Sequence, residues 1–413
     1  MVAIFAFLAM VLKLPIGISL ALSALAGALI GGEGLALRHL VEGAFGYFET
    51  ILIILTAMIF MKVLQASGIL DSITAALLKT FYRKKLPLLL TVTALIMFPG
   101  MITGSSTTAV LTTGVLVAPV LVRLGLSKVK AAALIAMGAI LGMIAPPVNI
   151  LVMIMGAGVD MPYVGLTGPL LIIVVPSALL IAFWLGYKDI KIIHYEEMKS
   201  ILPESVFFSY GFRLYIPLAI VLLLMLGQSF LAEVMPDIGI PAIFLLGSLT
   251  GLFCGRPFHF LKITQEAVKE AMPILSILVG VGMFIQIMTL TGGRGWAVIS
   301  FLSLPPVLLY AGIGISMPLF GAVSAYGSAS ILGVPFILAL IGKNAVITAS
   351  ALSAIAGLGD LMPPTALAGM FAAQIIGEKN YFKVLRFCFV PALFLLSSGL
   401  GILLLAPLLD KII

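Results

Sequence analysis

Long runs of apolar residues, about 20 at a time, alternate with short polar segments along most of the chain. Runs of this length fit α-helices that cross a membrane, whereas membrane barrel strands would show shorter segments of alternating polarity. The pattern therefore predicts an all-α polytopic membrane protein. The predicted apolar segments are about 1–12, 15–31, 45–65, 86–102, 107–122, 131–158, 163–187, 214–232, 241–254, 271–290, 305–319, 328–341, 344–377 and 384–409.

Two apolar regions contain polar interruptions at matching places. The first holds the polar turn Thr103–Thr108 and then the pair Pro146-Pro147, and the second holds Gly321–Ser324 and then Pro363-Pro364. The landmarks that lie 217 positions apart are Gly104 and Gly321, Gly142 and Gly359, and the two proline pairs. A constant offset over four landmarks indicates an internal repeat. Such breaks inside a membrane are tolerated only where they line a cavity or are buried in protein.

The basic residues fall mainly on one side of the predicted helices. The side that carries 18 of the 23 lysines and arginines has Lys13, Lys79, Arg83, Lys84, Lys85, Arg123, Lys128, Lys130, Lys188, Lys191, Lys199, Arg213, Arg256, Lys262, Lys269, Lys379, Lys383 and Arg386. The other side has Arg38, Arg294, Lys343 and Lys411, and Lys62 lies within a predicted helix. The positive-inside rule makes the first side cytoplasmic.

The two halves face opposite ways in this arrangement. Arg38 and Lys262 lie 224 positions apart at matching points, yet the charge distribution puts them on opposite sides. This predicts two inverted-topology repeats, an organisation typical of secondary transporters whose site lies at the repeat interface. We therefore expect a first repeat at 1–186 with a hairpin at about 86–122 and a broken helix at 131–158, a cytoplasmic connector at 187–213, and a second repeat at 214–413 with a hairpin at about 305–341 and a broken helix at 344–377.

Charge alone leaves two paths open for the first hairpin. Two full crossings and one re-entrant hairpin both return the chain to the cytoplasm. The run Thr103–Thr108 has six Gly, Ser and Thr residues and no charged residue, which fits a turn at mid-membrane better than a turn among headgroups. We therefore favour re-entrant helical hairpins.

Hydroxyl side chains gather in the polar turns. Ser105, Ser106 and Thr107 in the first turn and Ser324 in the second supply hard oxygen ligands suited to Na⁺. The helix that starts after each turn favours an anionic substrate group at its N-terminus. Close helix packing is the alternative role for such small residues. Two matched clusters, each followed by a proline-broken helix, favour a binding site.

Each proline pair unwinds its helix, because proline cannot donate a backbone hydrogen bond. The carbonyls freed in 142–149 and 359–365 can complete ion sites. Asp360 is the strongest coupling candidate, since an intramembrane carboxylate is costly and usually marks an ion or proton path. A structural carboxylate capped by backbone amides is the alternative. Asn149 either donates to substrate or satisfies loop backbone groups.

Other functional classes lack support in the sequence. There is no nucleotide-binding loop, nucleophile–base arrangement or redox motif, and the two cysteines, Cys254 and Cys388, exclude a cysteine-based metal site. We therefore expect no enzyme activity and no organic cofactor. The net charge of +7 is explained by the cytoplasmic loops and does not indicate a nucleic-acid partner.

The motifs together resemble the large membrane subunit (DctM-like) of TRAP transporters, within the ion transporter superfamily. The resemblance rests on the GSS of the first turn, the proline about fifteen residues later (Pro119), the RLGLSK turn, the LGMIAPPV run and the second-half GLGDLMPPTALAG. It extends over nearly the whole chain. It implies an elevator-type, Na⁺-driven importer of organic acids in the inner membrane. It also implies two partners, an extracytoplasmic substrate-binding protein and a small four-helix membrane subunit.

The resemblance also implies the site residues. Carried over by position, a first ion site uses Gly104, Ser105, Ser106 and the loop from Pro146 to Asn149, and a second uses the turn from Gly321 to Gly327 and the loop from Gly359 to Thr365. The ion ligands implied in this way are Gly104, Ser105, Ser106, Thr107, Pro146, Val148, Gly321, Ser324, Gly327, Gly359, Asp360, Met362 and Thr365. The substrate contacts come from Ser106, Asn149, Ser324 and Thr365.

This chain departs from the family pattern mainly in its second half. The family commonly has Ser where Val148 stands, Thr at Met362 and Val-Gly at 365–366. It often has an acid near Ala325, where this chain has none, and we expect Asp360 to supply that charge from the facing loop. The departures leave open whether Na⁺ or H⁺ is the coupling ion.

We interpret the chain as the transport subunit of a cation-coupled importer of small organic acids, a multi-pass protein of the inner membrane. The alternative within the same class is a stand-alone carboxylate or anion symporter that needs no binding protein. An ion channel is less well supported, because the inverted repeat and the lone carboxylate do not form a continuous charged pore.

Overall fold

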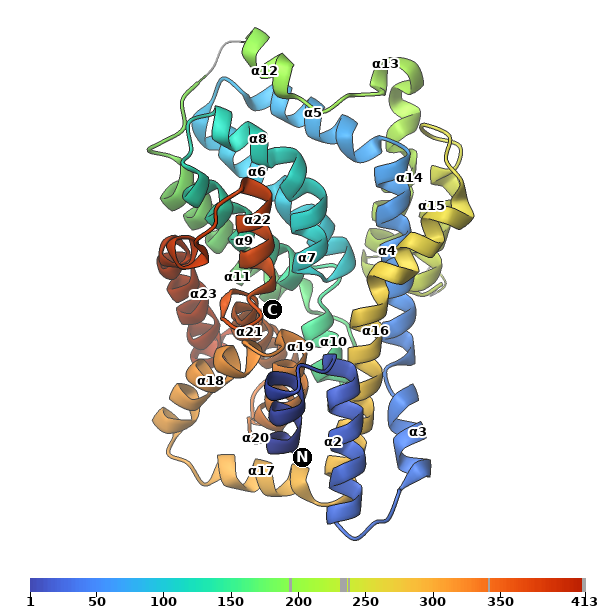
Figure 1. The fold of residues 1–413 in the computed structure, drawn as a ribbon, viewed down its shortest axis with the longest axis vertical. Helices are drawn as coiled ribbons and strands as arrows, with labels where there is room; N and C mark the ends of the chain where they lie inside the picture. The colour runs from blue at the N-terminus through green and yellow to red at the C-terminus, as the bar shows by residue number, and fades with distance from the viewer. Residues whose placement is uncertain (193–194, 231–235, 237, 341, 411–413) are drawn as a thin grey trace.

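The computed structural model describes residues 1–192, 195–230, 236, 238–340 and 342–410, and every regular element in these ranges is helical (Figure 1). Lys411 of the charge count lies outside the described residues. Within them, seven helical stretches are long and apolar enough to cross a membrane. These are Phe48–Ala66, Lys85–Thr103, Ser106–Arg123, Thr167–Gly186, Phe207–Gln228, Phe260–Leu290 and Tyr381–Leu409. The chain is a multi-pass membrane protein.

One group of helices, which we call the flanking bundle, lies on the right in Figure 1. It consists of α2 (Ile16–Ile30), α3 (Leu37–Phe45), α4 (Phe48–Ala66), α14 (Ile216–Phe230), α15 (Ile240–Gly251) and α16 (Phe260–Leu290). The long helix α16 packs along α2, α3 and α4, and α15 packs against α4 and α14. A Cβ on Gly282 would lie 1.9 Å from the carbonyl oxygen of Gly43, so glycines allow the crossing of α16 and α3. Lys62 of α4 forms an ion pair with Glu270 of α16.

The second group, the central bundle, contains both polar turns and both proline pairs. It consists of α6 (Lys85–Thr103), α7 (Ser106–Ala109), η2 (Val110–Gly114), α8 (Val115–Arg123), α9 (Lys128–Ile144), α10 (Ile150–Gly158), α11 (Thr167–Ile181), η3 (Ala182–Gly186), α18 (Pro306–Gly321), α19 (Ala325–Ser328), η5 (Ala329–Gly333), α20 (Val334–Ala339), α21 (Ala345–Gly357), η6 (Leu358–Leu361), α22 (Leu367–Ile376) and α23 (Tyr381–Leu409).

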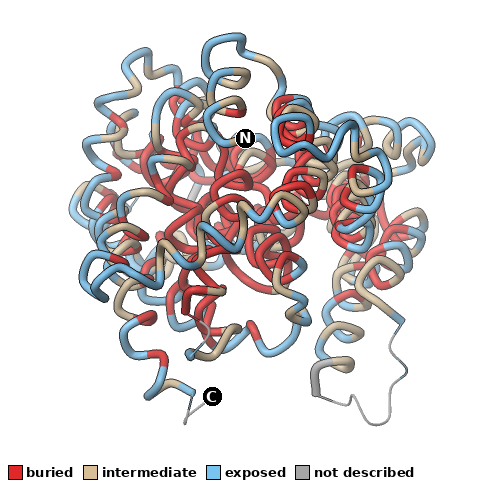
Figure 2. The backbone as a smooth tube through the Cα atoms, turned by 90° about the horizontal axis from the view of Figure 1, so that it is seen from below, coloured by how far each residue is buried: buried red, intermediate tan, exposed pale blue. Residues whose placement is uncertain are grey.

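Helices α9 and α21 form the core of the central bundle. Every residue of α9 from Ala131 to Ile144 is buried, as is every residue of α21 from Ile347 to Gly357. Helix α9 packs against α6, α22 and α23, and α21 packs against α10, α18 and α23. A helix that is apolar on all sides fits such a central place. Figure 2 shows the buried backbone surrounded by exposed segments. Helix α9 ends at the first proline-containing loop, and α21 continues into η6 (Leu358–Leu361), which precedes the second.

Two helices link the bundles at opposite ends of the molecule (Figure 1). Helix α5 (Ile69–Phe81) connects α4 to α6, and α17 (Gly293–Leu302) connects α16 to α18. Each follows a glycine in the left-handed conformation, Gly68 with φ 76° and Gly292 with φ 71°, where the chain changes direction. The remaining elements are α1 (Val2–Ala6), η1 (Phe7–Val11), α12 (Tyr195–Ile201), α13 (Phe207–Tyr210) and η4 (Gly211–Tyr215).

Candidate functional site

The first polar turn lies inside the central bundle, between α6 and α7. Gly104 ends α6 and turns the chain in the left-handed conformation, with φ 62°. Ser105 is the N-cap of α7, and its Oγ accepts a hydrogen bond from the backbone N–H of Thr108 at 3.3 Å. Ser105 and Ser106 are buried, and Thr107 is partly buried. The turn therefore holds two hydroxyls away from the protein surface.

The second polar turn has the same plan. Ser324 is the N-cap of α19, and its Oγ accepts a hydrogen bond from the backbone N–H of Gly327 at 3.1 Å. A short π-helix follows each turn, η2 after α7 and η5 after α19. The residues at equivalent places are therefore Ser105 and Ser324, 219 positions apart, and not Gly104 and Gly321.

The sequence places Gly321 at the start of the second polar turn, where a glycine is expected to turn the chain sharply, and this expectation is wrong. Gly321 is the last residue of α18, and its φ is not positive. A Cβ on Gly321 would lie 2.7 Å from the Cα of Gly359, so glycine is needed because two backbones touch. The first proline-broken region has a similar contact, since a Cβ on Gly142 would lie 2.4 Å from the carbonyl oxygen of Met97. In both halves, the helix that leads into a polar turn is therefore in backbone contact with the end of α9 or with η6, which follows α21.

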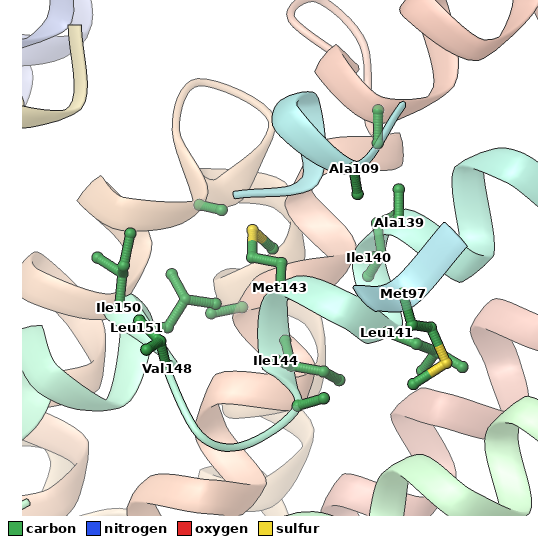
Figure 3. Close-up of a cluster of buried hydrophobic side chains, with 14 of the residues drawn as sticks. Met97, Ala109, Ala139, Ile140, Leu141, Met143, Ile144, Val148, Ile150 and Leu151 are labelled. Carbon is green, nitrogen blue, oxygen red and sulfur yellow. The ribbon is translucent and has the colours of Figure 1, made fainter. Parts of the chain in front are cut away.

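The first proline-containing loop is buried. Helix α9 ends at Ile144 and α10 begins at Ile150, so the helix is interrupted around the buried Pro146. The backbone N–H of Val148 donates to the carbonyl oxygen of Met101 at 3.1 Å. Figure 3 shows the Val148 side chain among apolar neighbours. Because that side chain has no polar atom, Val148 can offer an ion only its backbone oxygen.

Asn149 supports the loop that it ends. Its Nδ2 donates to the carbonyl oxygen of Ile144 at 2.8 Å and to Ser353 Oγ at 3.0 Å. Its Oδ1 accepts from the backbone N–H of Val152 at 3.1 Å, and its own backbone N–H donates to the Tyr163 hydroxyl at 2.7 Å. All polar groups of the side chain are engaged within the protein. Of its two expected roles, the geometry favours satisfying the loop backbone.

The second proline-containing loop follows α21. Gly359 and Asp360 are buried within η6, at the start of the interruption. Thr365 donates its backbone N–H and its Oγ1 hydrogen to the carbonyl oxygen of Ala322, at 3.3 and 2.8 Å. The backbone N–H of Val148 makes the comparable bond in the first loop. The first loop is thus tied to the end of α6, and the second loop to the polar turn that precedes it in the chain.

The two loops differ in exposure. Pro146 and Val148 are buried, whereas Pro363 and Pro364 are exposed and Met362 is partly buried. The second loop is therefore the more accessible of the two from outside the bundle.

Side chains connect the two halves of the site. Ser106 Oγ donates a hydrogen bond to Asp360 Oδ2, and the Tyr326 hydroxyl donates to the carbonyl oxygen of Gly104 at 3.2 Å. Asp360 is 5% exposed, and within the described ranges it has no ion pair. An ionised carboxylate in such surroundings is costly unless a proton or a cation balances it.

This geometry differs from the expected grouping of the ligands. The sequence assigns Ser106 to one ion site and Asp360 to another, but the two side chains are in contact. Asp360 is expected to provide its charge to the second turn near Ala325, whereas its hydrogen bond is to the first turn. The reason is that α22, which follows Asp360, packs against α7, η2 and α8.

Sequence reasoning does not single out two tyrosines that shape the site. Tyr326 is buried and bonds the two turns together, and Tyr163 accepts from Asn149 and donates to the carbonyl oxygen of Pro147 at 2.9 Å. The sequence offers only the general rule that a buried tyrosine hydroxyl usually has a hydrogen-bond partner. That rule does not name the partner.

The site consists of oxygen donors. Hydroxyl, carboxylate and carbonyl oxygens suit a hard cation. No group of three or more His, Cys, Asp and Glu residues that could hold a metal ion occurs in the part of the chain that the structure describes. The donor set therefore fits a hard cation.

Known proteins are similar to this chain in sequence and in fold. The family described as "Tripartite ATP-independent periplasmic transporter, DctM component" matches residues 2–409. The YdaH transporter of Alcanivorax borkumensis has a similar structure, with a TM-score of 0.65 and 16% sequence identity over 94% of this chain and 96% of that chain. The Neisseria gonorrhoeae protein MtrF, from a class of antimetabolite efflux pumps, has a TM-score of 0.57 and 16% identity over 89% of this chain and 83% of that chain.

None of the curated proteins compared with the chain matches it. At 16% identity, the two solved structures show the fold alone. The family match, in contrast, extends over nearly all residues, including both polar turns and both proline-containing loops. The chain therefore belongs to the DctM family, the membrane transport component of tripartite ATP-independent periplasmic transporters.

Proposed function

We propose that this chain imports small organic acids and that Na⁺ is the coupling ion. The observation that carries the proposal is the hydrogen bond between Ser106 and Asp360. It joins a buried hydroxyl of the first turn to a buried carboxylate of the second proline-containing loop. Since Asp360 lacks an ion pair within the described ranges, a bound cation would balance its charge. The surrounding oxygens are suitable ligands.

The proposed ion sites combine both halves of the chain. Ser105, Ser106 and Asp360 provide side-chain oxygens, and the nearby loops provide carbonyls. The full set of proposed ion ligands is Gly104, Ser105, Ser106, Thr107, Pro146, Val148, Gly321, Ser324, Gly327, Gly359, Asp360, Met362 and Thr365. We place the substrate against Ser106, Ser324 and Thr365, with Asn149 acting mainly through the loop that it stabilises.

We further propose that the chain moves as an elevator built from two inverted repeats. The first would comprise residues 1–186 and the second residues 214–413, joined by 187–213. Two similarities support this organisation, the matched N-caps Ser105 and Ser324 and the linking helices α5 and α17 at opposite ends. The central bundle would carry the site across the membrane, and the flanking bundle would stay fixed. In this proposal, the α6–α8 and α18–α20 regions are re-entrant hairpins.

The family description is of a tripartite system, which supports two partners for this chain. We propose an extracytoplasmic binding protein that delivers the organic acid and a small four-helix membrane subunit that packs beside the chain. The substrate class is small organic acids, such as C4-dicarboxylates and sugar acids.

Uptake by reconstituted protein tests this function. The full chain, together with its small membrane subunit and binding protein, would be placed in liposomes and offered a panel of radiolabelled C4-dicarboxylates and sugar acids. The proposal predicts accumulation driven by an inward Na⁺ gradient. Accumulation driven by a pH gradient in Na⁺-free buffer would contradict Na⁺ coupling. Equal uptake without the binding protein would contradict the tripartite arrangement and favour a stand-alone symporter.

A further inference from the structure

An open groove lies between α8 and the C-terminal end of α22, away from the site described above. Its volume is about 400 Å³. Its aliphatic lining includes Val115 and Val122 of α8 and Ile375 and Ile376 of α22. Val115 is 43% exposed and Val122 is 39% exposed, so this part of α8 faces outward. An aliphatic surface groove on a membrane protein can hold a lipid acyl chain.

Two basic residues, Arg123 and Lys128, line the same groove. Neither has an ion pair in the part of the chain that the structure describes. The nearby Lys130, by contrast, forms an ion pair with Asp189, and its Nζ lies 5.6 Å from the centre of the Phe387 ring. The groove is thus an aliphatic surface with two cations that form no ion pair within the described ranges.

Glu378, the acidic residue next in the chain to this groove, forms no ion pair within the described ranges. Lys128 Nζ lies 4.0 Å from the position that a Cβ on Gly377 would take, so the end of α22 is close to this cation. Glu378 follows Gly377, but its Oε1 accepts a hydrogen bond from the backbone N–H of Asn380. Among the described residues, neither Arg123 nor Lys128 is held in an ion pair, so both can contact an anion.

A second cavity gives a useful contrast. It has a volume of about 360 Å³ and lies between α2, α4 and α16. Its lining, which includes Ile18, Ile51 and Met272, contains no charged residue. Nothing in that cavity selects one lipid over another, whereas Arg123 and Lys128 distinguish the groove at α8.

We propose that the groove binds an anionic phospholipid of the cytoplasmic leaflet. One acyl chain lies along the aliphatic residues of α8 and α22, and the phosphate lies near Arg123 and Lys128. The distribution of basic residues assigns this end of the molecule to the cytoplasmic side, where anionic lipids attract basic residues near the membrane surface. A small soluble anion would contact the two basic side chains but not the aliphatic residues. The presence of both in one groove therefore favours a lipid.

The position of the groove gives the lipid a structural role. Helix α22, which follows Asp360 and the second proline-containing loop, packs along the continuous segment α7, η2 and α8, which begins at Ser106. A lipid between α8 and α22 contacts both segments at their cytoplasmic ends. It therefore affects the spacing of the helices that bring Ser106 and Asp360 together.

Lipid retention measured by native mass spectrometry tests the proposal. The full chain would be titrated with phosphatidylglycerol and, separately, with phosphatidylcholine. We expect the wild-type protein to bind phosphatidylglycerol more tightly. The double substitution Arg123→Ala and Lys128→Ala should weaken that binding about 30-fold, because it removes two basic residues that attract an anionic lipid headgroup. Val122→Trp should also weaken it, by filling the aliphatic part of the groove.

The matched control is Arg83→Ala with Lys84→Ala, which removes one arginine and one lysine that are exposed and do not line the groove. It should leave phosphatidylglycerol binding unchanged. Equal weakening by both double substitutions would overturn the proposal, because the effect would then be one of general charge. Equal binding of the two lipids by the wild-type protein would overturn it too. Displacement of the lipid by millimolar inorganic phosphate would show a soluble-anion site instead.

Discussion

The Ser106 hydroxyl and the Asp360 carboxylate, 254 positions apart in the chain, are hydrogen bonded in the interior of the central bundle. Ser106 begins the helix after the first polar turn, and Asp360 lies in η6 before the second proline-containing loop. The contact makes the candidate site one composite structure. A change at either residue should therefore affect the ligand environment provided by both halves.

Replacing Tyr326 with Phe should weaken the link between the two turns. The substitution removes the hydrogen bond from the tyrosine hydroxyl to the buried carbonyl oxygen of Gly104. Leaving such a group without a partner costs about 1–3 kcal/mol, so the unfolding temperature should fall. Thermal unfolding of the detergent-solubilised protein measures the change. Tyr187→Phe, at an exposed tyrosine, should have little effect, and equal shifts for the two variants would contradict this account.

Gly321→Ala should destabilise the protein, although Ala is the better helix former. The added Cβ would lie 2.7 Å from the Cα of Gly359, and overpacking of this kind costs about 1–3 kcal/mol. Gly312→Ala in the same helix is the matched control, because a Cβ there meets nothing within 4 Å. That variant should be neutral or more stable by about 0.5–1 kcal/mol. Thermal unfolding of the two variants side by side checks the prediction, which fails if they behave alike.

Asn149→Ala should reduce stability while leaving substrate affinity nearly unchanged. The side chain satisfies the Ile144 carbonyl and the Val152 N–H, so its removal leaves buried groups without partners. The expected loss is about 1–3 kcal/mol. Asn380→Ala provides a control, because Asn380 is also an N-cap residue but makes no side-chain cap bond. A large rise in the substrate concentration for half-maximal uptake, with normal stability, would instead indicate direct contact with substrate.

The local features of the fold could be predicted from the sequence. The breaks at Pro146 and at Pro363 follow from the chemistry of proline, and the polar residues of Thr103–Thr108 mark a turn in an otherwise apolar stretch. The observed helix ends, at Ile144 and at Thr103, lie where these signals predict an interruption. Such features depend on residues that are neighbours in the chain.

The contacts across the site could not be predicted in the same way. Tyr326 reaches a carbonyl 222 positions away, and nothing in its immediate sequence identifies that partner. Gly321 looks like a turn residue in the sequence, but its need for glycine comes from the backbone of Gly359. Asp360 faces the first turn because α22 packs against α7, η2 and α8. These relationships arise only when the whole bundle is packed.

A double-mutant cycle on Na⁺ binding tests the central claim most directly. The concentration of NaCl that half-maximally stabilises the detergent-solubilised protein, at constant ionic strength with KCl, would be measured for the wild type, Ser106→Ala, Asp360→Asn and the double variant. Asp189→Asn, which alters an acid outside the site, is the control. If Ser106 and Asp360 act together on one ion, each single change should raise that NaCl concentration about tenfold. The double variant should then need no more NaCl than the single variant that binds Na⁺ more weakly. An effect of about 100-fold in the double variant would show that the two residues act independently and not as one hydrogen-bonded unit, and no change in either single variant would contradict a shared cation site.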